Sequence, residues 1–109
     1  MAFLLGSARD GNAEPGSDID LAVLLGGRAT FDLYVRLQDA VASIAPGPHC
    51  DIGVLDGAEP VYRYETLKGR LLLAKDPEAF LSFYSLACRE YEAQMHDYAR
   101  QLRYRTGAA

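Results

Sequence analysis

Two aspartates, Asp18 and Asp20, stand at the head of an apolar run that continues to Leu25. The run is rich in branched residues, which favours a β-strand, and the side chains of a strand alternate between its two faces. Both carboxylates therefore lie on one face, while Ile19 and Leu21 point to the other. Two like charges held so close repel each other unless a cation lies between them. This segment therefore predicts a strand that carries an acidic, cation-binding site at its start.

A glycine and a serine precede these acids and add the features of a phosphate site. Gly6 and Ser7 directly follow a first apolar run, from Ala2 to Leu5, which predicts a short buried strand. Glycine lets the backbone come close to a ligand, and the serine hydroxyl with nearby free amide groups can bind an anion. Magnesium prefers carboxylate oxygens together with the phosphates of a substrate. The segment from Gly6 to Asp20 therefore predicts a metal-dependent phosphate site.

These same residues carry a resemblance to a known family. The pair Gly6-Ser7, a spacer and then Ser-Asp-Ile-Asp at residues 17–20 resemble the signature of the DNA polymerase β-like nucleotidyltransferase superfamily. The short chain is similar to the minimal nucleotidyltransferases, the MntA type, which occur as antitoxins beside HEPN-domain toxins. The resemblance implies an α/β (α+β) fold, with a small mixed β-sheet flanked by helices, palm-like as in polymerase β, and a long C-terminal helix. An acidic turn before an ordinary strand is the alternative interpretation.

The resemblance also implies which residues act. Three carboxylates would bind two magnesium ions and serve catalysis: Asp18, Asp20 and Asp51. The nucleotide, implied to be ATP, would be bound by Gly6, Ser7, Arg9 and Ser17. Many relatives have an arginine directly after Gly-Ser, where this chain has Ala8 and then Arg9. Arginine suits phosphate, so Arg9 either reaches the triphosphate or is a solvated loop residue.

Asp51 is in the position where the resemblance places the third acid, near the start of another apolar segment, residues 49–55, which predicts a strand. A carboxylate inside an apolar strand is costly without a partner, which favours a functional role over an acid that merely faces water. Asp56 and Glu59 compete for this role, but both fall in the turn that follows. His49 either tunes Asp51 or touches a phosphate, or it is a satisfied or exposed histidine.

The rest of the chain predicts three helices and one further strand. Thr30 can cap a helix that runs to about residue 44, where a Pro-Gly-Pro sequence ends it. A short helix over residues 59–68 and a strand over 70–74 follow. Asp76 and Pro77 then start a helix that continues to about residue 104. Such a helix is on the order of 40 Å long, more than a small sheet can cover. Its far end is expected either to pack on a partner or to fray.

Composition sets the remaining bounds. The chain has 109 residues, which predicts a single domain over residues 1–109, and its net charge of −4 argues against a nucleic-acid surface. No apolar run is long enough to span a membrane, and the start lacks the features of a signal peptide. The cysteines, Cys50 and Cys88, show neither disulfide-framework nor metal-site spacing. These features predict a cytoplasmic protein with reduced thiols.

The resemblance implies that the chain moves AMP from ATP to a hydroxyl, a tyrosine of a HEPN toxin. Two alternatives stay open: a small-molecule acceptor, as in aminoglycoside nucleotidyltransferases, and a non-catalytic, nucleotide-binding antitoxin subunit. Relatives usually carry a helix before the first strand, whereas this sequence begins with the strand. Some apolar surface beside that strand should therefore stay open, and open apolar surfaces usually mark interfaces. We expect a homodimer or a pair with a HEPN protein.

Overall fold

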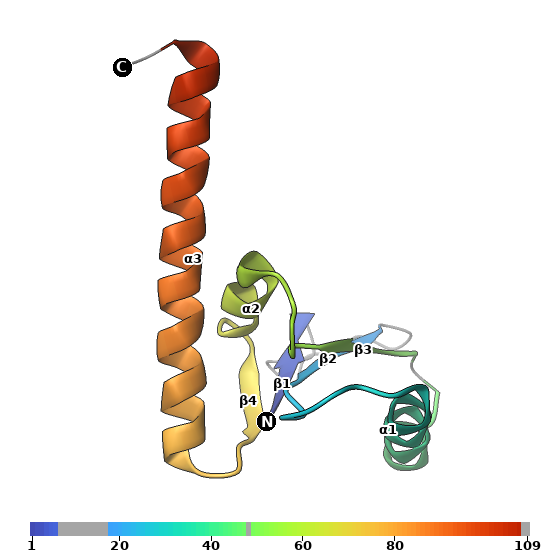
Figure 1. Cartoon of the computed structure of the whole chain (residues 1–109). Coiled ribbons are helices and arrows are strands. Elements are labelled where there is room, and N and C mark those ends of the chain that lie inside the picture. The colour runs from blue at the N-terminus through green and yellow to red at the C-terminus, as the bar shows by residue number, and fades with distance from the viewer. Residues whose placement is uncertain (7–17, 48, 108–109) are drawn as a thin grey trace.

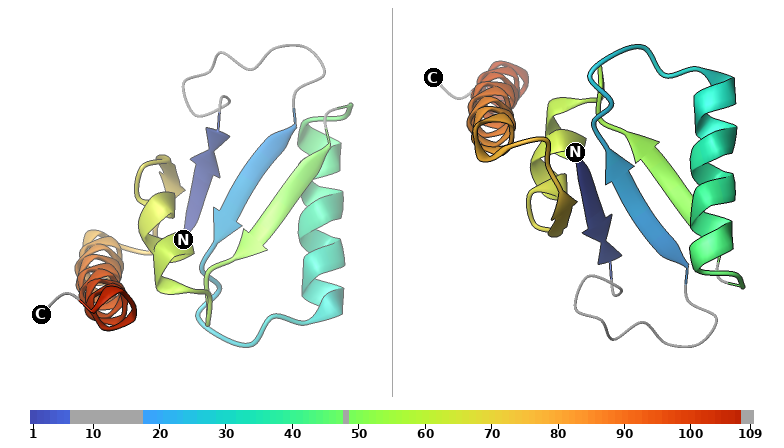
Figure 2. Two further views of the ribbon diagram at one scale, coloured as in Figure 1. Left: turned by 90° about the horizontal axis from the view of Figure 1, so that it is seen from above. Right: turned by 90° about the horizontal axis from the view of Figure 1, so that it is seen from below.

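The computed structural model describes residues 1–6, 18–47 and 49–107. These form, in chain order, β1 (Ala2–Leu5), β2 (Ile19–Val23), α1 (Phe31–Ile44), β3 (Cys50–Val54), α2 (Pro60–Thr66), β4 (Arg70–Leu73) and α3 (Pro77–Thr106). The strands make one four-stranded sheet in the order β3-β2-β1-β4. Helix α1 lies along β3, whereas α2 and α3 lie near the opposite side of the sheet (Figures 1 and 2). The mixed sheet and the long last helix confirm the predicted fold class.

The sheet contains both kinds of strand pairing. β1 is antiparallel to β2 and to β4, whereas β2 and β3 are parallel. Parallel neighbours need a crossover connection, and α1 supplies it between β2 and β3. The C-terminal end of β1 therefore lies at the same edge of the sheet as the N-terminal ends of β2 and β3. This edge holds both segments that the sequence singled out, the end of the first strand and the acids of the second.

The helix starts follow the sequence closely. The Thr30 hydroxyl accepts a hydrogen bond from the Leu33 amide at 3.2 Å, and the Asp76 carboxylate accepts one from the Ala79 amide at 2.7 Å. Both predicted N-caps are thus confirmed. α3 has 30 residues, which makes it about 45 Å long. It ends at Gly107, whose φ of 68° is the left-handed conformation that commonly closes a helix. The predicted long helix is therefore continuous.

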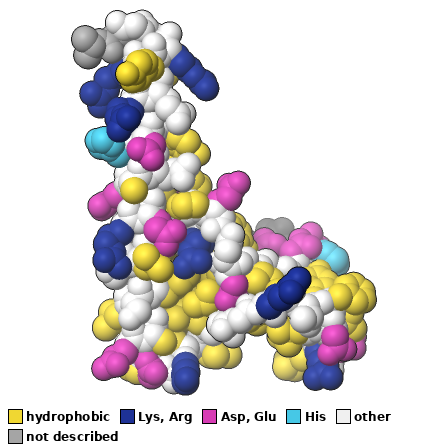
Figure 3. All heavy atoms as spheres, in the orientation of Figure 1, with side chains coloured by type: hydrophobic (Ala, Val, Ile, Leu, Met, Phe, Trp, Pro, Cys, Tyr) yellow, Lys and Arg dark blue, Asp and Glu magenta, His cyan; other side chains and the backbone are white. Residues whose placement is uncertain are grey.

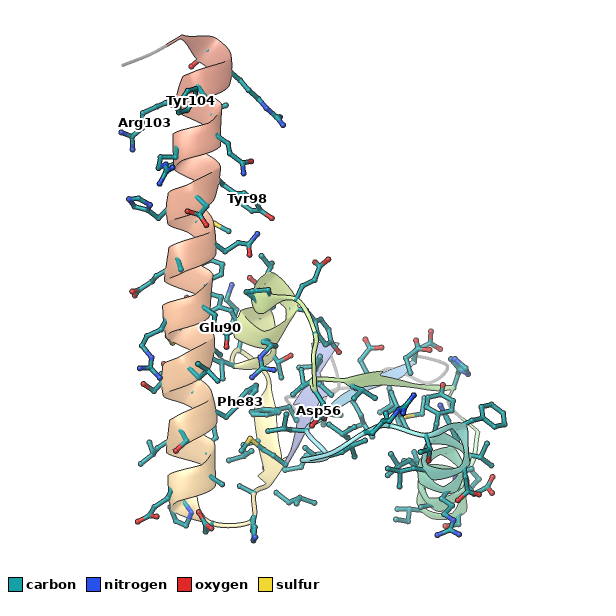
Figure 4. All side chains as sticks on the ribbon, viewed as in Figure 1. Asp56, Phe83, Glu90, Tyr98, Arg103 and Tyr104 are labelled. Carbon is teal, nitrogen blue, oxygen red and sulfur yellow. The ribbon has the colours of Figure 1, made fainter. Side chains whose placement is uncertain are left out.

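The core lies between the sheet and the first half of α3. Phe3 of β1 and Ala22 of β2 face each other in register, and both are buried. Leu55 and Phe83 complete this buried cluster. The rings of Phe3 and Phe83 are 5.8 Å apart between centroids, and Figure 4 shows Phe83 directed from α3 toward the strands. The first half of α3 is thus fixed to the face of the sheet that also carries Asp20 and Asp51.

Phe83→Ala is expected to lower the free energy of unfolding by about 3–5 kcal/mol, because it leaves a cavity beside Phe3. Chemical denaturation monitored by circular dichroism measures the change. Leu81→Ala on the same helix is the matched control, since Leu81 is 62% exposed and its loss should cost far less. Equal losses for the two variants would show that α3 does not pack as described.

Two elements leave apolar side chains open to solvent. Helix α1 buries none of its residues, and Phe31 and Ile44 are 82% and 84% exposed. These side chains stay exposed because α1 packs along β3 rather than across a face of the sheet. Leu72 and Leu73 of the edge strand β4 are also exposed. Open apolar surface therefore lies beside β1, in line with the expectation. Within the described ranges, no helix is long and apolar enough to cross a membrane.

Candidate nucleotide site

Two acidic residues from separate strands meet at the edge of the sheet. Asp20 of β2 and Asp51 of β3 are direct partners in the parallel pairing, so their side chains leave the same face. Leu5 of β1 is the partner of Asp20 on its other side. Acidic side chains gather over the starts of β2 and β3, next to a histidine (Figure 3). The structure thus brings together two of the three predicted carboxylates.

Gly6 brings the backbone against this pair. Its φ of 67° lies in the left-handed region, and a Cβ atom there would lie 3.3 Å from Oδ2 of Asp20. A side chain at this position would therefore be both strained and crowded. Gly6 thus places the backbone close to Asp20, and its close approach to a ligand stays a prediction. Three other predicted nucleotide-binding residues, Ser7, Arg9 and Ser17, lie outside the described residues.

Asp18 has a different position from the other two acids. It immediately precedes β2 and is exposed, and it is not among the residues that line the hollow around Asp20 and Asp51. In the parts of the chain that the structure describes, no three His, Cys, Asp or Glu side chains could hold a metal ion together. Magnesium, however, is usually bound by one or two carboxylates and completes its shell with phosphates and water. The hard oxygen donors of Asp20 and Asp51 fit that pattern.

Two neighbouring hollows adjoin the acidic pair. The first, about 370 Å³, is lined by Asp20 and Asp51 and by tyrosines from both flanking helices, Tyr34 and Tyr62. The second, about 240 Å³, is lined by residues that include Gly6, Lys68 and Gly69. Leu5 and Tyr62 line both hollows and so form the wall between them. Lys68 pairs with Glu65 at 3.1 Å, and that hydrogen bond is the main cause of its raised pKa.

The charges of Asp20 and Asp51 contribute to the raised pKa values of neighbouring groups. Burial raises the pKa of the Cys50 thiol, and the charges of Asp51 and Asp20 raise it further. Burial also raises the pKa of the Tyr62 phenol, with a second contribution from Asp20. His49 contacts Asp51 at 2.9 Å through Nε2 and Oδ1, and both side chains are largely exposed. A negative potential at this edge favours a bound cation.

The competing acids are placed elsewhere. Asp56 follows the end of β3, away from the edge where β3 begins, and accepts hydrogen bonds from the amides of Leu25 and Gly26 at 2.7 and 2.9 Å. Its carboxylate thereby ties the loop after β2 to the loop after β3. Glu59 precedes α2 and makes no side-chain cap there. Of the three candidates for the third acid, Asp51 is the one that lies beside Asp20.

Sequence reasoning missed Tyr62, the residue that α2 places over the acidic pair. The Tyr62 hydroxyl lies against Gly53 of β3, so closely that any Cβ at position 53 would collide with it. A glycine inside a strand often marks a close approach of another group. The isolated glycine in Cys-Asp-Ile-Gly-Val was therefore the signal in the sequence that could have indicated a side chain packed beside Asp51.

The comparisons with known proteins agree with this geometry. Three solved structures share the fold over 99% of this chain. A toxin–antitoxin with AMP-PNP has a TM-score of 0.75, 24% identity and 85% of its chain covered. A mutant of the toxin–antitoxin MntA–HpeT has a TM-score of 0.72, 21% identity and 84% covered. A complex of tri-AMPylated Shewanella oneidensis HEPN toxin with MNT antitoxin has a TM-score of 0.70, 20% identity and 82% covered.

The sequence comparison identifies the family. No curated protein matches the chain. The family described as "Polymerase beta, Nucleotidyltransferase" matches residues 1–78, which include the four described strands and helices α1 and α2. The match therefore spans most of the chain and the entire acidic edge, and it confirms the resemblance that the Gly-Ser and Asp-x-Asp residues carried. The chain belongs to the polymerase β-type nucleotidyltransferase family.

Proposed function

We propose that this protein is a magnesium-dependent nucleotidyltransferase that moves AMP from ATP to a tyrosine hydroxyl of a HEPN toxin, and so acts as an antitoxin. One observation carries the proposal: in a chain of this family, Asp20 and Asp51 stand in register beside the backbone of Gly6. Paired carboxylates next to a glycine turn suit the metal-bound phosphates of a nucleotide.

Each predicted residue has a part in this proposal. Asp18, Asp20 and Asp51 would hold two magnesium ions together with the phosphates of ATP. Magnesium, when bound, supplies positive charge that stabilises the negative charge of the reacting phosphates. Gly6 would let the backbone approach the nucleotide. Ser7, Arg9 and Ser17 would bind its phosphates.

The transfer itself is an in-line displacement at the α-phosphorus. The acceptor oxygen forms a new bond to phosphorus while the bond to the bridging oxygen breaks, and pyrophosphate leaves. The proton of the acceptor hydroxyl must go to a base. Asp51 is our choice for that base, or for a ligand of the catalytic ion, because its carboxylate is exposed and stands beside Asp20. The contact with His49 would orient it.

The proposed acceptor rests on similar complexes and on the exposed end of α3. One similar structure contains AMP-PNP, and in another the HEPN toxin bound to its antitoxin is tri-AMPylated. In this chain, Tyr98, Leu102 and Tyr104 are exposed on the part of α3 that extends past α2 (Figures 1 and 4). Such apolar side chains favour a protein partner. We therefore propose a hetero-oligomer with a HEPN protein, or a homodimer, in the cytoplasm.

Incubation of the purified chain with its cognate HEPN protein, magnesium and α-labelled ATP tests this function. We expect label on a tyrosine of the partner, no label after chelation of magnesium, and a stable complex by light scattering. Label transferred only to an aminoglycoside would establish a small-molecule acceptor instead. Complex formation and nucleotide binding without any transfer would establish a non-catalytic antitoxin subunit. Either result would overturn the proposed acceptor.

A further inference from the structure

Tyr62 is held over the acidic edge by a helix that is anchored on several sides. The Arg63 guanidinium donates to the Leu55 carbonyl at 2.9 Å, which ties α2 to the end of β3. The ring of Tyr64 stacks on Tyr91 of α3, with centroids 3.9 Å apart and planes 10° apart. The fully buried Thr66 donates to the Tyr62 carbonyl at 2.9 Å. Because its backbone is fixed, the phenol has little freedom to leave its place.

The ring occupies space that β3 leaves open for it. Gly53 lies two residues after Asp51, so it is on the same face of the strand. A Cβ at position 53 would lie 3.0 Å from the Tyr62 Cζ atom and would collide with the hydroxyl. The absence of a side chain at Gly53 is thus what allows the phenol to lie beside the carboxylates.

The Tyr62 hydroxyl is not engaged by the described residues. It forms no hydrogen bond with any residue in the described ranges, whereas the hydroxyl of Tyr34, in the same hollow, accepts one from the Gln38 amide at 3.0 Å. Tyr62 is 37% exposed and forms, with Leu5, the wall between the acidic hollow and the hollow of Lys68. The phenol, at the boundary of both hollows and close enough to Asp20 for that charge to add to the effect of burial in raising its pKa, is placed to contact a molecule bound over the acidic pair.

We propose that Tyr62 is a positioning residue for the nucleotide: its hydroxyl donates a hydrogen bond to a phosphate oxygen of the triphosphate held over Asp20 and Asp51. The inference rests on the proposed function and adds a residue to it. A polyphosphate that faces two carboxylates needs donors as well as cations, and a phenol donates without adding charge. The phosphates beyond the reacting one would pass over the Tyr62 ring toward Lys68 and the backbone of Gly6.

The test is the binding of AMP-PNP with magnesium, measured by calorimetry, so it does not depend on turnover. Tyr62→Phe should weaken binding by roughly tenfold to a hundredfold, the range for a hydrogen bond to a charged group. Its melting temperature should stay unchanged, since the lost hydroxyl bonds none of the residues that the structure describes. Tyr84→Phe is the matched control, because Tyr84 is an exposed tyrosine of α3 that lines neither hollow, and it should bind AMP-PNP like the wild type. In turnover assays, Tyr62→Phe should raise KM for ATP far more than it lowers kcat.

A second variant tests the placement of the ring. Gly53→Ala should push the phenol aside and weaken AMP-PNP binding, and its effect should largely disappear in the Tyr62→Phe background. Wild-type affinity for AMP-PNP in Tyr62→Phe would overturn the inference. Loss of affinity in Tyr62→Ala but not in Tyr62→Phe would assign the role to the ring and so overturn it too. AMP attached to Tyr62 itself would also overturn it.

These outcomes are separable from those of the proposed function. Weaker AMP-PNP binding by Tyr62→Phe in a chain that transfers no AMP would uphold the role of Tyr62 and reject the transfer. If the chain transfers AMP but Tyr62→Phe binds AMP-PNP normally, the transfer is upheld and the role of Tyr62 is rejected.

Discussion

The double variant Asp18→Asn with Asp20→Asn is expected to transfer nucleotide at least about a thousandfold more slowly than the wild type, because metal binding supplies several kcal/mol of transition-state stabilisation. Its fold should remain intact. Asp20 lies directly opposite Asp51, and two like charges held so close repel each other. Without metal, the melting temperature of the variant should therefore hold or rise.

Two measurements on the same preparation decide this prediction: the initial rate with α-labelled ATP, and thermal unfolding in the presence of a chelator. Asp39→Asn, an exposed acid of α1, is the matched control and should change neither quantity. Transfer at the wild-type rate by the double variant would mean that the site is elsewhere. A sharp fall in the melting temperature would show instead that the carboxylates support the fold.

Asp51→Asn should mainly reduce turnover, whereas Asp56→Asn should mainly reduce stability. Asp51→Asn is expected to reduce turnover far more than it weakens ATP binding, because a base or a ligand of the catalytic ion acts mainly in the transition state. It should cost little stability, since the carboxylate of Asp51 is exposed. Asp56→Asn should instead lower the free energy of unfolding by about 1–3 kcal/mol, because it disturbs the hydrogen bonds from Leu25 and Gly26.

The measurements are kcat and KM for ATP, together with denaturation curves for both variants. Rates for Asp56→Asn are taken per folded molecule, so that its instability is not mistaken for a catalytic defect. Normal turnover in Asp51→Asn together with a large loss in Asp56→Asn would show that the wrong acid was chosen.

The features that the sequence predicted best are local ones. Thr30 and Asp76 cap their helices because the hydroxyl or carboxylate bonds an amide only three residues away. The strands that carry Asp20 and Asp51 follow from short apolar runs between turn residues. That these two acids share a face follows from alternation within each strand, but their direct opposition also required the parallel register of β2 and β3.

Features that depend on how distant elements dock could not be predicted. Helix α1 packs along β3 at the side of the sheet, so Phe31 stays exposed, and the sequence alone does not indicate this docking. Asp56 was a plausible catalytic acid until the fold placed it against two backbone amides. Tyr62 lies in the acidic hollow only because α2 packs over Gly53. Of these contacts, the one between Tyr62 and β3 leaves a mark in the sequence, the glycine inside the strand at position 53.

The uneven packing of α3 has a consequence for amide hydrogen exchange. Its first half is held by Phe83, Ala87 and the stack of Tyr91 on Tyr64, whereas every side chain from residue 96 to residue 106 is exposed. Amides of the first half should exchange only when the whole protein unfolds, and those of the last turns through local fraying. One uninterrupted helix would then show two protection regimes, with the boundary near Met95. A partner that binds the outer turns would move that boundary toward the C-terminus.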